Sequence, residues 1–348
     1  MSYLCSGLSK EVLSPISLLV ISFSVINYVV RVSVHAGSVN AHFFFVIFTS
    51  KPISSLIELF YGILIFIIFM KPVHLFLTLA VTFMLSACSQ EFAFVQMADT
   101  QIGFNDNSPH FIHSDTLMQK AVEAVNRLRP AAVIICGDLI NQPWGEGDEK
   151  VFDEQNRIFE ANLKKFDPSI DVRLVPGNHD IHGFSALTLE AYVQLRGYER
   201  FAFRKKGCAF IGFDTSRIMD DAPEAAQEQW IWLEEQLRKA RNARFTFLFI
   251  HCPVFRTNIG EGESYFNFPK EVRQQYLDLF KKYGVDAVFA GHTHKDYSCE
   301  AEGIRFYVAG AVGNCLGRGY PGYHVVSVGK RDFEVVYTAT PGVIVQSH

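Results

Sequence analysis

Short apolar runs alternate with stretches of helical periodicity over residues 89–348. An apolar run of about four to eight residues that ends at Gly, Pro or a polar residue is typical of a buried strand. By this criterion we expect strands at Phe92–Met97, Ala131–Cys136, Val172–Val175, Phe245–Ile250 and Val285–Ala290. Apolar positions three and four apart predict helices at Leu117–Leu128, Lys150–Lys165, Ser185–Leu195 and Pro269–Tyr283, and another that begins near its expected N-cap, Asp221.

Several shorter apolar runs indicate hairpins. Phe201–Arg204 and Cys208–Phe213 flank a tight turn at Lys206-Gly207, and three further runs close the chain at Ile304–Val308, Tyr323–Val328 and Phe333–Thr338. Strands and helices therefore alternate in the first part, and hairpins follow later. This order predicts a mixed α/β domain built in layers.

The first 88 residues differ in composition from the rest of the chain. They carry four basic and two acidic side chains, which leaves 28 basic and 34 acidic ones for the other 260 residues. That larger part is long enough to bury a full core. Its net negative charge argues against binding to a nucleic-acid backbone, because proteins that do so usually present a basic face.

Residues 70–88 have the organisation of an export signal. Met70 and Lys71 precede the apolar run Leu75–Leu85, and two small residues then lead to Cys88. This is the pattern of a signal peptide of ordinary length. Its end resembles the bacterial lipobox, in which the cysteine becomes lipidated. The resemblance implies an exported bacterial cell-envelope lipoprotein that is attached to a membrane through lipidated Cys88.

Two interpretations fit the apolar segment 1–69. The runs Val12–Val30 and Ile53–Phe69 approach the length of membrane-spanning helices. Alternatively, translation starts at Met70 and the upstream residues are a mis-assigned start. We favour the second, because a lipobox signal acts at an N-terminus. The predicted parts are thus the apolar segment 1–69, the signal peptide 70–88 and a folded domain, 89–348.

Polar side chains follow five of the predicted strands directly. Because the carboxyl ends of parallel strands meet at one edge of an α/β sheet, we expect these side chains to lie close together. Carboxylate, imidazole and amide groups are all ligands of divalent cations. In chain order they are Asp99 and Gln101, Asp138, Asn178 and His179, His251, and His292 and His294.

In this order the motifs resemble those of the calcineurin-like metallophosphoesterase superfamily: D-x-H, G-D, G-N-H-D/E, H and G-H-x-H. The match spans roughly Phe92 to Thr338. The resemblance implies a four-layer αββα sandwich, preceded here by the apolar N-terminal segment. It also implies two divalent metal ions that clamp a phosphate, lower the pKa of a bridging water and stabilise in-line displacement.

The same resemblance assigns a role to each residue of the pattern. His179 would be the general acid that protonates the leaving oxygen, and Asp180 would orient its ring. Asp138 would bridge the two metals. The other predicted ligands are Asp99, Gln101 and His294 at the first metal, and Asn178, His251 and His292 at the second.

Gln101 departs from the pattern, because most members of the superfamily carry His at this place. An amide oxygen is a neutral, hard ligand that favours Mn²⁺ or Mg²⁺ over softer metals, with Fe or Zn as the alternatives. A subgroup with D-x-Q resembles this chain further, in Tyr265-Phe266-Asn267 and in Gly310-Ala311-Val312-Gly313. This D-x-Q subgroup is that of calcineurin-like phosphoesterase domain-containing protein 1, whose eukaryotic member is known as a protein serine/threonine phosphatase.

Three further residues are predicted to face a substrate. Arg256 and Tyr265 lie in the long segment His251–Phe268, and Asn314 lies in the glycine-rich segment Gly310–Gly322. Arg256 could pair with a phosphate or ester oxygen. The alternative for Arg256 is an ordinary solvated loop residue.

These observations predict a membrane-anchored, metal-dependent phosphoesterase that acts on phosphate monoesters, with a small molecule or a phosphoprotein as substrate. A phosphodiesterase for nucleotides or lipids is the main alternative within the enzymes. A metal-binding lipoprotein with weakened catalysis is the alternative from another class, and Gln101 is the feature that motivates it.

Overall fold

The computed structural model describes residues 17–24, 29–36, 39–46, 91–317 and 319–343. The chain divides into two compact units, Met1–Val81 and Thr82–His348. In the first unit, β1 (Ser17–Ser24), β2 (Val29–Ala36) and β3 (Val39–Val46) form an antiparallel sheet in that order.

The described part of the run Val12–Val30 therefore lies in strands. Within the described ranges, no helix is both long and apolar enough to cross a membrane. The run Ile53–Phe69 and the signal segment Met70–Cys88 lie outside the described residues. The predicted division at residues 69 and 88 stays a prediction.

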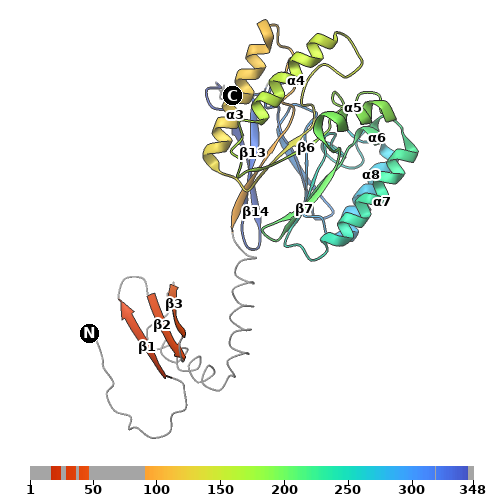
Figure 1. Ribbon diagram of the computed structural model, residues 1–348. Helices are drawn as coiled ribbons and strands as arrows, with labels where there is room; N and C mark the ends of the chain where they lie inside the picture. The colour runs from red at the N-terminus through yellow and green to blue at the C-terminus, as the bar shows by residue number, and fades with distance from the viewer. Residues whose placement is uncertain (1–16, 25–28, 37–38, 47–90, 318, 344–348) are drawn as a thin grey trace, which may run out of the picture. The chain divides into compact units, whose positions relative to one another are not determined.

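Two sheets form the centre of the second unit (Figure 1). The five-stranded sheet has the order β14 (Phe333–Ala339), β13 (Gly322–Val328), β4 (Phe92–Met97), β5 (Ala132–Cys136), β6 (Asp171–Val175). In it, β4, β5 and β6 are parallel, while β13 and β14 continue it antiparallel beside β4.

The six-stranded sheet has the order β11 (Tyr297–Ala301), β12 (Ile304–Val308), β10 (Ala287–Ala290), β9 (Thr246–Phe249), β8 (Cys208–Gly212), β7 (Phe201–Lys205). In it, β8, β9, β10 and β12 are parallel, and β7 and β11 are antiparallel edge strands.

Helices cover the outer face of each sheet. One group packs on the five-stranded sheet and includes α3 (Ile112–Leu128), which follows the short η1 (Pro109–Phe111), α4 (Glu149–Leu163) and α5 (Ala186–Arg196). The other packs on the six-stranded sheet and consists of α6 (Ser216–Met219), α7 (Pro223–Ala240) and α8 (Lys270–Tyr283). The predicted four-layer αββα sandwich is confirmed.

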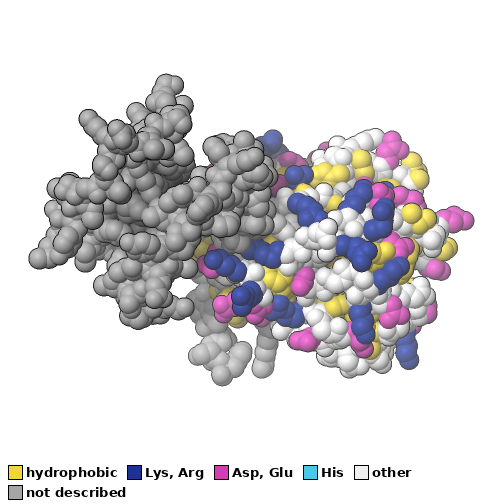
Figure 2. All heavy atoms as spheres, turned by 90° about the horizontal axis from the view of Figure 1, so that it is seen from below, with side chains coloured by type: hydrophobic (Ala, Val, Ile, Leu, Met, Phe, Trp, Pro, Cys, Tyr) yellow, Lys and Arg dark blue, Asp and Glu magenta, His cyan; other side chains and the backbone are white. Residues whose placement is uncertain are grey.

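Phenylalanine rings fill the space between the two sheets. Phe94 of β4 is fully buried, and its ring centroid lies 5.1 to 5.9 Å from those of four phenylalanines on the facing sheet. Those neighbours are Phe210, Phe247, Phe249 and Phe289. Tilted and edge-to-face rings at such distances add to the free energy gained by burial alone. On the outside, basic and acidic side chains are interspersed over the face of this unit that Figure 2 shows.

Two predictions about single elements were wrong, and one strand was not predicted. Helix α3 begins at Ile112 rather than Leu117, because the Asp106 carboxylate accepts the Ser114 backbone N–H at 2.7 Å and so satisfies its first turn. Helix α7 has Ala222 at its N-cap, without a side-chain cap, rather than Asp221. Strand β11 was missed altogether.

Candidate metal centre

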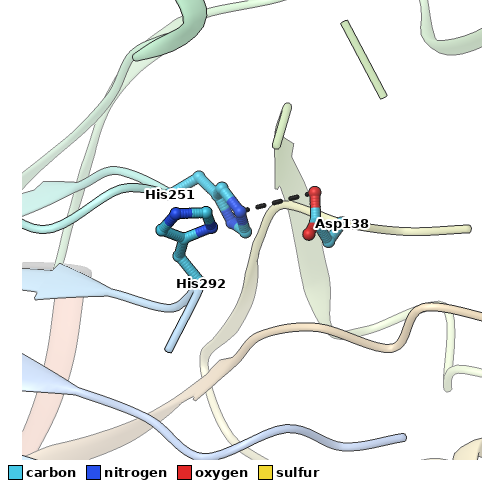
Figure 3. Close-up of side chains that lie close together, drawn as sticks. All are labelled: Asp138, His251 and His292. Atoms are coloured by element: carbon cyan, nitrogen blue, oxygen red, sulfur yellow. Dashed lines mark ion pairs between the residues drawn. The ribbon is translucent and has the colours of Figure 1, made fainter. Parts of the chain in front are cut away.

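The structure brings the seven predicted ligands together at the carboxyl ends of the central strands. Asp138, His251 and His292 follow β5, β9 and β10 by two residues each. One potential ligand atom from each of these three lies within 4.8 Å of the others, and all three side chains are buried (Figure 3). Asp138 Oδ1 is 3.4 Å from His251 Nε2. This geometry suits a cation held between a carboxylate and two imidazoles.

Asn178 completes this group from the loop after β6. Its Oδ1 lies 3.1 Å from His251 Nε2, and its Nδ2 donates a hydrogen bond to the Tyr265 hydroxyl at 2.7 Å. The amide is therefore oriented with its oxygen towards the histidine and its nitrogen away from it. These contacts match the second predicted ligand set.

The first predicted ligand set lies around Asp99. Its Oδ1 is 3.5 Å from His294 Nε2, and its carboxylate accepts the His292 backbone N–H at 2.9 Å. The loop that carries Gln101 contacts the loop that carries Asp138, since the Gln101 backbone N–H donates to the Asp138 backbone carbonyl at 2.8 Å. Burial raises the pKa of the Asp99 carboxyl, and Asp138 lies near enough for its charge to raise that pKa further. The predicted bridging role of Asp138 stays a prediction.

Each of the three histidines is fixed by a backbone carbonyl. Nδ1 of His251 lies 2.8 Å from the Cys136 carbonyl oxygen, and Nδ1 of His294 lies 2.8 Å from that of Asn314. For His292 the bonded atom is Nε2, at 2.8 Å from the Tyr265 carbonyl oxygen. In a neutral ring, a nitrogen that donates to a carbonyl leaves the other nitrogen with its lone pair free, which is the arrangement typical of metal-binding histidines. At His251 the other nitrogen, Nε2, faces the oxygens of Asn178 and Asp138.

Five of the seven predicted ligands have a left-handed backbone. Their φ angles are 50° at Asp99, 30° at Gln101, 50° at Asp138, 72° at His292 and 53° at His294. Non-glycine residues adopt this region rarely, at a cost of about 1–3 kcal/mol each, and such residues cluster at functional sites. The surrounding sheets hold this strain in place.

Two glycines of the motifs allow the polar groups to approach one another. A Cβ atom on Gly177 would lie 2.2 Å from Asp138 Oδ1, and one on Gly291 would lie 2.6 Å from Asp99 Oδ2. Real Cβ atoms do not come so close to an oxygen, so a larger residue at either place would displace a predicted ligand.

Burial and charge shift the pKa values of the site strongly. Burial would raise the pKa of Asp138, but His251 outweighs it and holds that pKa well below its usual range. Asp138 in turn outweighs the burial of His251 and raises the pKa of that imidazole to about 10. Burial, with His251 nearby, lowers the pKa of His292 to about 4, and burial raises the pKa of Asp99. A concentration of shifted groups is typical of a functional site.

Gln101 tests whether divalent cations fit here. Its Oε1 is buried and has no hydrogen-bond partner, while its Nε2 faces Asn141 Oδ1 at 3.5 Å. A buried oxygen without a partner destabilises a fold by about 1–3 kcal/mol. A hard cation would satisfy this oxygen, and the oriented histidines and the carboxylates would complete its ligands. The residues present therefore fit divalent metal ions.

His179 lies beside this centre, as predicted, but a different residue orients it. Its Nδ1 is 2.7 Å from the Asn141 carbonyl oxygen, and its backbone N–H donates to Asp138 Oδ1. The Asp180 carboxylate instead accepts the backbone N–H groups of Gly177 and Leu139. The prediction that Asp180 orients the ring was therefore wrong: Asp180 fastens the loop, and its pKa is raised to about 7 by burial and by Asp138.

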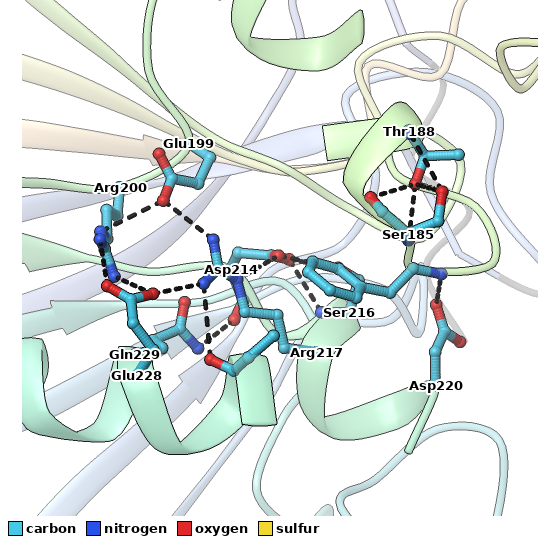
Figure 4. Close-up of polar contacts among 12 residues, drawn as sticks. Ser185, Thr188, Glu199, Arg200, Asp214, Ser216, Arg217, Asp220, Glu228 and Gln229 are labelled. Atoms are coloured by element: carbon cyan, nitrogen blue, oxygen red, sulfur yellow. Dashed lines mark hydrogen bonds and ion pairs between the residues drawn. The ribbon is translucent and has the colours of Figure 1, made fainter. Parts of the chain in front are cut away.

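The segment that follows His179 is anchored on the six-stranded side (Figure 4). The Phe184 backbone N–H donates to the Asp220 carboxylate at 2.8 Å, and the guanidinium of buried Arg217 lies over the Phe184 ring. Arg217 itself pairs with Asp214, Glu199 and Glu228. This network limits the movement of the loop that carries Asn178 and His179.

The three residues predicted to face a substrate differ in their surroundings. Arg256 is 43% exposed, with Nε 3.7 Å from Glu261 Oε1. Tyr265 is exposed, but its hydroxyl and carbonyl contact two predicted ligands, Asn178 and His292. The side-chain amide of Asn314 donates to the Phe104 backbone carbonyl, and the backbone carbonyl of Asn314 accepts a hydrogen bond from His294. Tyr265 and Asn314 therefore position ligands.

Sequence reasoning missed the functional contacts made through backbone carbonyls. Asn141 fixes His179, and Cys136 fixes His251, each through a main-chain oxygen. Such an oxygen belongs to every residue type, so no letter of the sequence marks it. Asn141 did have a positional signal, since it lies three residues after Asp138 in the segment that follows β5.

Comparison with known proteins agrees with this geometry. The profile of the family described as calcineurin-like phosphoesterase matches residues 92–296. The serine/threonine-protein phosphatase CPPED1 of Rattus norvegicus is 33% identical over 253 residues, which cover 68% of this chain and 80% of the relative. The Homo sapiens protein of that name is 31% identical, with the same coverage.

Two solved structures share the fold. A dimetal phosphatase from Danio rerio superposes with a TM-score of 0.56 at 17% identity, covering 73% of this chain and 98% of that one. GAP50 of Plasmodium, an anchor in the inner membrane complex, gives a TM-score of 0.54 at 13% identity, covering 72% and 85%. Together with the profile match, the relatives and the site geometry, this shows that the chain belongs to the calcineurin-like phosphoesterase family and is a hydrolase of phosphoester bonds.

Proposed function

We propose that this protein hydrolyses phosphate monoesters, including phosphorylated protein side chains, at a centre of two divalent metal ions. The observation that carries the proposal is the arrangement around Asp138. Its carboxylate lies beside His251 of one predicted set, and its charge acts on Asp99 of the other. It also accepts the backbone N–H of His179, whose ring is fixed by the Asn141 carbonyl. The serine/threonine phosphatases among the relatives support phosphorylated proteins as one class of substrate.

The ligands divide into two groups. When bound, the cations would supply positive charge for the phosphate and lower the pKa of a water nucleophile. Asp99, Gln101 and His294 would hold one of them and Asn178, His251 and His292 the other, with Asp138 shared. Gln101 favours Mn²⁺ or Mg²⁺, because its amide oxygen is a hard ligand.

His179 provides the proton for the leaving group. The Asn141 carbonyl accepts the Nδ1–H of the protonated ring, so the proton available for transfer is the one on Nε2. That proton moves to the ester oxygen as the P–O bond breaks, and it neutralises the alkoxide that would otherwise leave. The neutral imidazole that remains keeps its hydrogen bond to Asn141.

Hydrolysis of p-nitrophenyl phosphate tests the proposal. We expect turnover with Mn²⁺ or Mg²⁺, none after chelation, and a loss of roughly 10³-fold in Asp138→Asn, because both cations lose a charged ligand. A wild-type protein that binds metal but is inert would support the weakened metal-binding lipoprotein instead. Faster hydrolysis of bis-p-nitrophenyl phosphate than of the monoester would favour the phosphodiesterase.

We also propose that the enzyme is exported and held at a membrane by a lipidated Cys88. The signal-like order of charged, apolar and small residues before Cys88 supports this. Mass spectrometry of the mature protein tests it. An N-terminal acylated Cys88 is the expected result, and an unmodified peptide that contains both Ala87 and Cys88 would refute it.

A further inference from the structure

An open groove of about 700 Å³ adjoins the candidate metal centre. Thr293, which lines it, lies between His292 and His294 in the chain. Phe266 lines it as well, and its ring centroid is 5.3 Å from that of His292. One part of the groove is therefore next to the predicted metal ligands, where a phosphoryl group would lie. The rest has room for what is attached to that phosphate.

The groove is cationic on a domain that is acidic as a whole. Arg256 and Lys295 line it, and no Asp or Glu side chain does. Lys295 forms no ion pair within the described ranges. Arg256 forms an ion pair with Glu261, at 3.7 Å from Nε to Oε1, and that carboxylate also accepts the backbone N–H groups of Arg256 and Thr257. Lys295 is thus the groove cation without an acidic partner among the described residues, and with the Arg256 guanidinium it favours an anionic ligand beside the phosphate.

Strand β11 gives the groove a free backbone edge. Tyr297, Ser298 and Cys299 line the groove, and all belong to this strand. β11 is the last strand of its sheet and pairs with β12 alone. Apart from that pairing, the described structure contains no hydrogen bond to the backbone of residues 297–301. An edge with unpaired N–H and C=O groups can accept an extended peptide as an added strand.

We propose that this groove binds an extended, acidic polypeptide segment that flanks the phosphorylated residue of the substrate. The segment pairs with the free edge of β11, and its carboxylates lie against Arg256 and Lys295. This inference rests on the proposed function for its catalytic consequence, and it narrows the substrates to proteins with acidic residues beside the phosphate. A small phosphomonoester would leave the groove empty.

Binding and turnover test the groove separately. A fluorescein-labelled acidic decapeptide without phosphate should bind to the full chain, as followed by fluorescence anisotropy. Binding should weaken by roughly fivefold or more in Arg256→Gln/Lys295→Gln, the scale of two exposed charge pairs. Lys330→Gln, which removes a charge in the β13–β14 turn outside the groove, should bind like the wild type. N-methylation of alternate backbone amides of the peptide should weaken binding by roughly tenfold in one register only, because those amides pair with β11.

Turnover is compared on two phosphoserine peptides that differ only in acidic against neutral flanking residues. The acidic peptide should have the higher kcat/KM, mainly through KM, and the ratio of the two values should approach one in Arg256→Gln/Lys295→Gln. Equal values in the wild type, an unchanged ratio in the double variant, or equal binding of all methylated peptides would overturn the inference. An inert enzyme that still binds the acidic peptide would instead sink the proposed function and leave the groove assignment standing.

Discussion

The middle and the carboxyl end of the same strands have opposite chemistry. In β10, Phe289 is fully buried among aromatic rings, and three residues later His292 lies in the candidate metal centre. In β5, Ile134 is equally buried, and Asp138 lies four residues beyond it. The middle regions hold side chains that need no partner except close packing. The ends hold charges, fixed imidazoles and left-handed backbone.

This contrast shows how the chain supports a costly site. A cluster of buried carboxylates and histidines destabilises a fold that contains no cation, because each buried charge loses its hydration. The left-handed ligand positions add strain to that cost. The aromatic layer between the sheets stabilises the strands that carry these groups, so stability and catalysis depend on different residues of the same strands.

Phe289→Ala tests whether the aromatic layer stabilises the strands, and it should have the largest effect of the variants considered. The loss of a fully buried ring should lower the free energy of unfolding by about 3–5 kcal/mol, as measured by urea denaturation. The surface variant Val336→Ala, on β14, should change it by less than about 0.5 kcal/mol. A Phe289→Ala protein of wild-type stability would contradict the division.

His179→Ala tests the catalytic half. We expect kcat/KM for phosphoserine to fall by roughly 10²–10³-fold, since the serine alkoxide needs a proton to leave. The loss should be much smaller for p-nitrophenyl phosphate, because nitrophenolate leaves without one. His182→Ala, which removes an exposed imidazole from the same loop, is the matched control. Equal losses on both substrates would mean that His179 is not the general acid.

Gln101→Ala should have an intermediate effect, confined to the first metal. Without the amide oxygen, the affinity for one of two Mn²⁺ ions should fall by roughly tenfold or more. Isothermal titration calorimetry on the metal-free protein measures both sites. The same variant should be no less stable than the wild type without metal, because the buried oxygen that lacks a partner is gone. An unchanged affinity at both sites would exclude Gln101 as a ligand.

The smallest expected effect concerns Asp214, a buried carboxyl group that pairs with Arg217. Burial raises the pKa of its carboxyl, against the hydrogen bonds of Ser216 and the charge of Arg217. The folded state therefore holds this proton to higher pH than the unfolded state, whose pKa is near 3.8. Stability from this group is complete below that pH and is lost as pH rises through the folded pKa. Asp214→Asn should flatten this part of the stability profile of the metal-free protein; an unchanged slope would contradict it.

The sequence predicted the layers, and the strand ends at which polar side chains gather, because both depend on side-chain type. Apolar runs mark buried strands, and the polar residue after each run marks a strand end. It did not predict what depends on contacts between distant segments. Asp106 starts helix α3 through Ser114, and the Glu302-Gly303 turn that folds β11 back on β12 has no strong apolar run before it. The carbonyl partners of the histidines are invisible for the same reason.

Those carbonyl partners also bear on what must change when the centre is filled. His292 and His294 each bond one ring nitrogen to a carbonyl, so a cation that arrives meets the lone pair of the other nitrogen. His251, whose pKa is raised to about 10, first has to lose a proton. Loading then needs no ring flip, but it releases the His251 proton. In the metal-free protein, the three bonded imidazole N–H protons should exchange slowly with solvent and be visible as separate signals in proton NMR spectra. Folding therefore positions the imidazole rings of the centre before any metal binds.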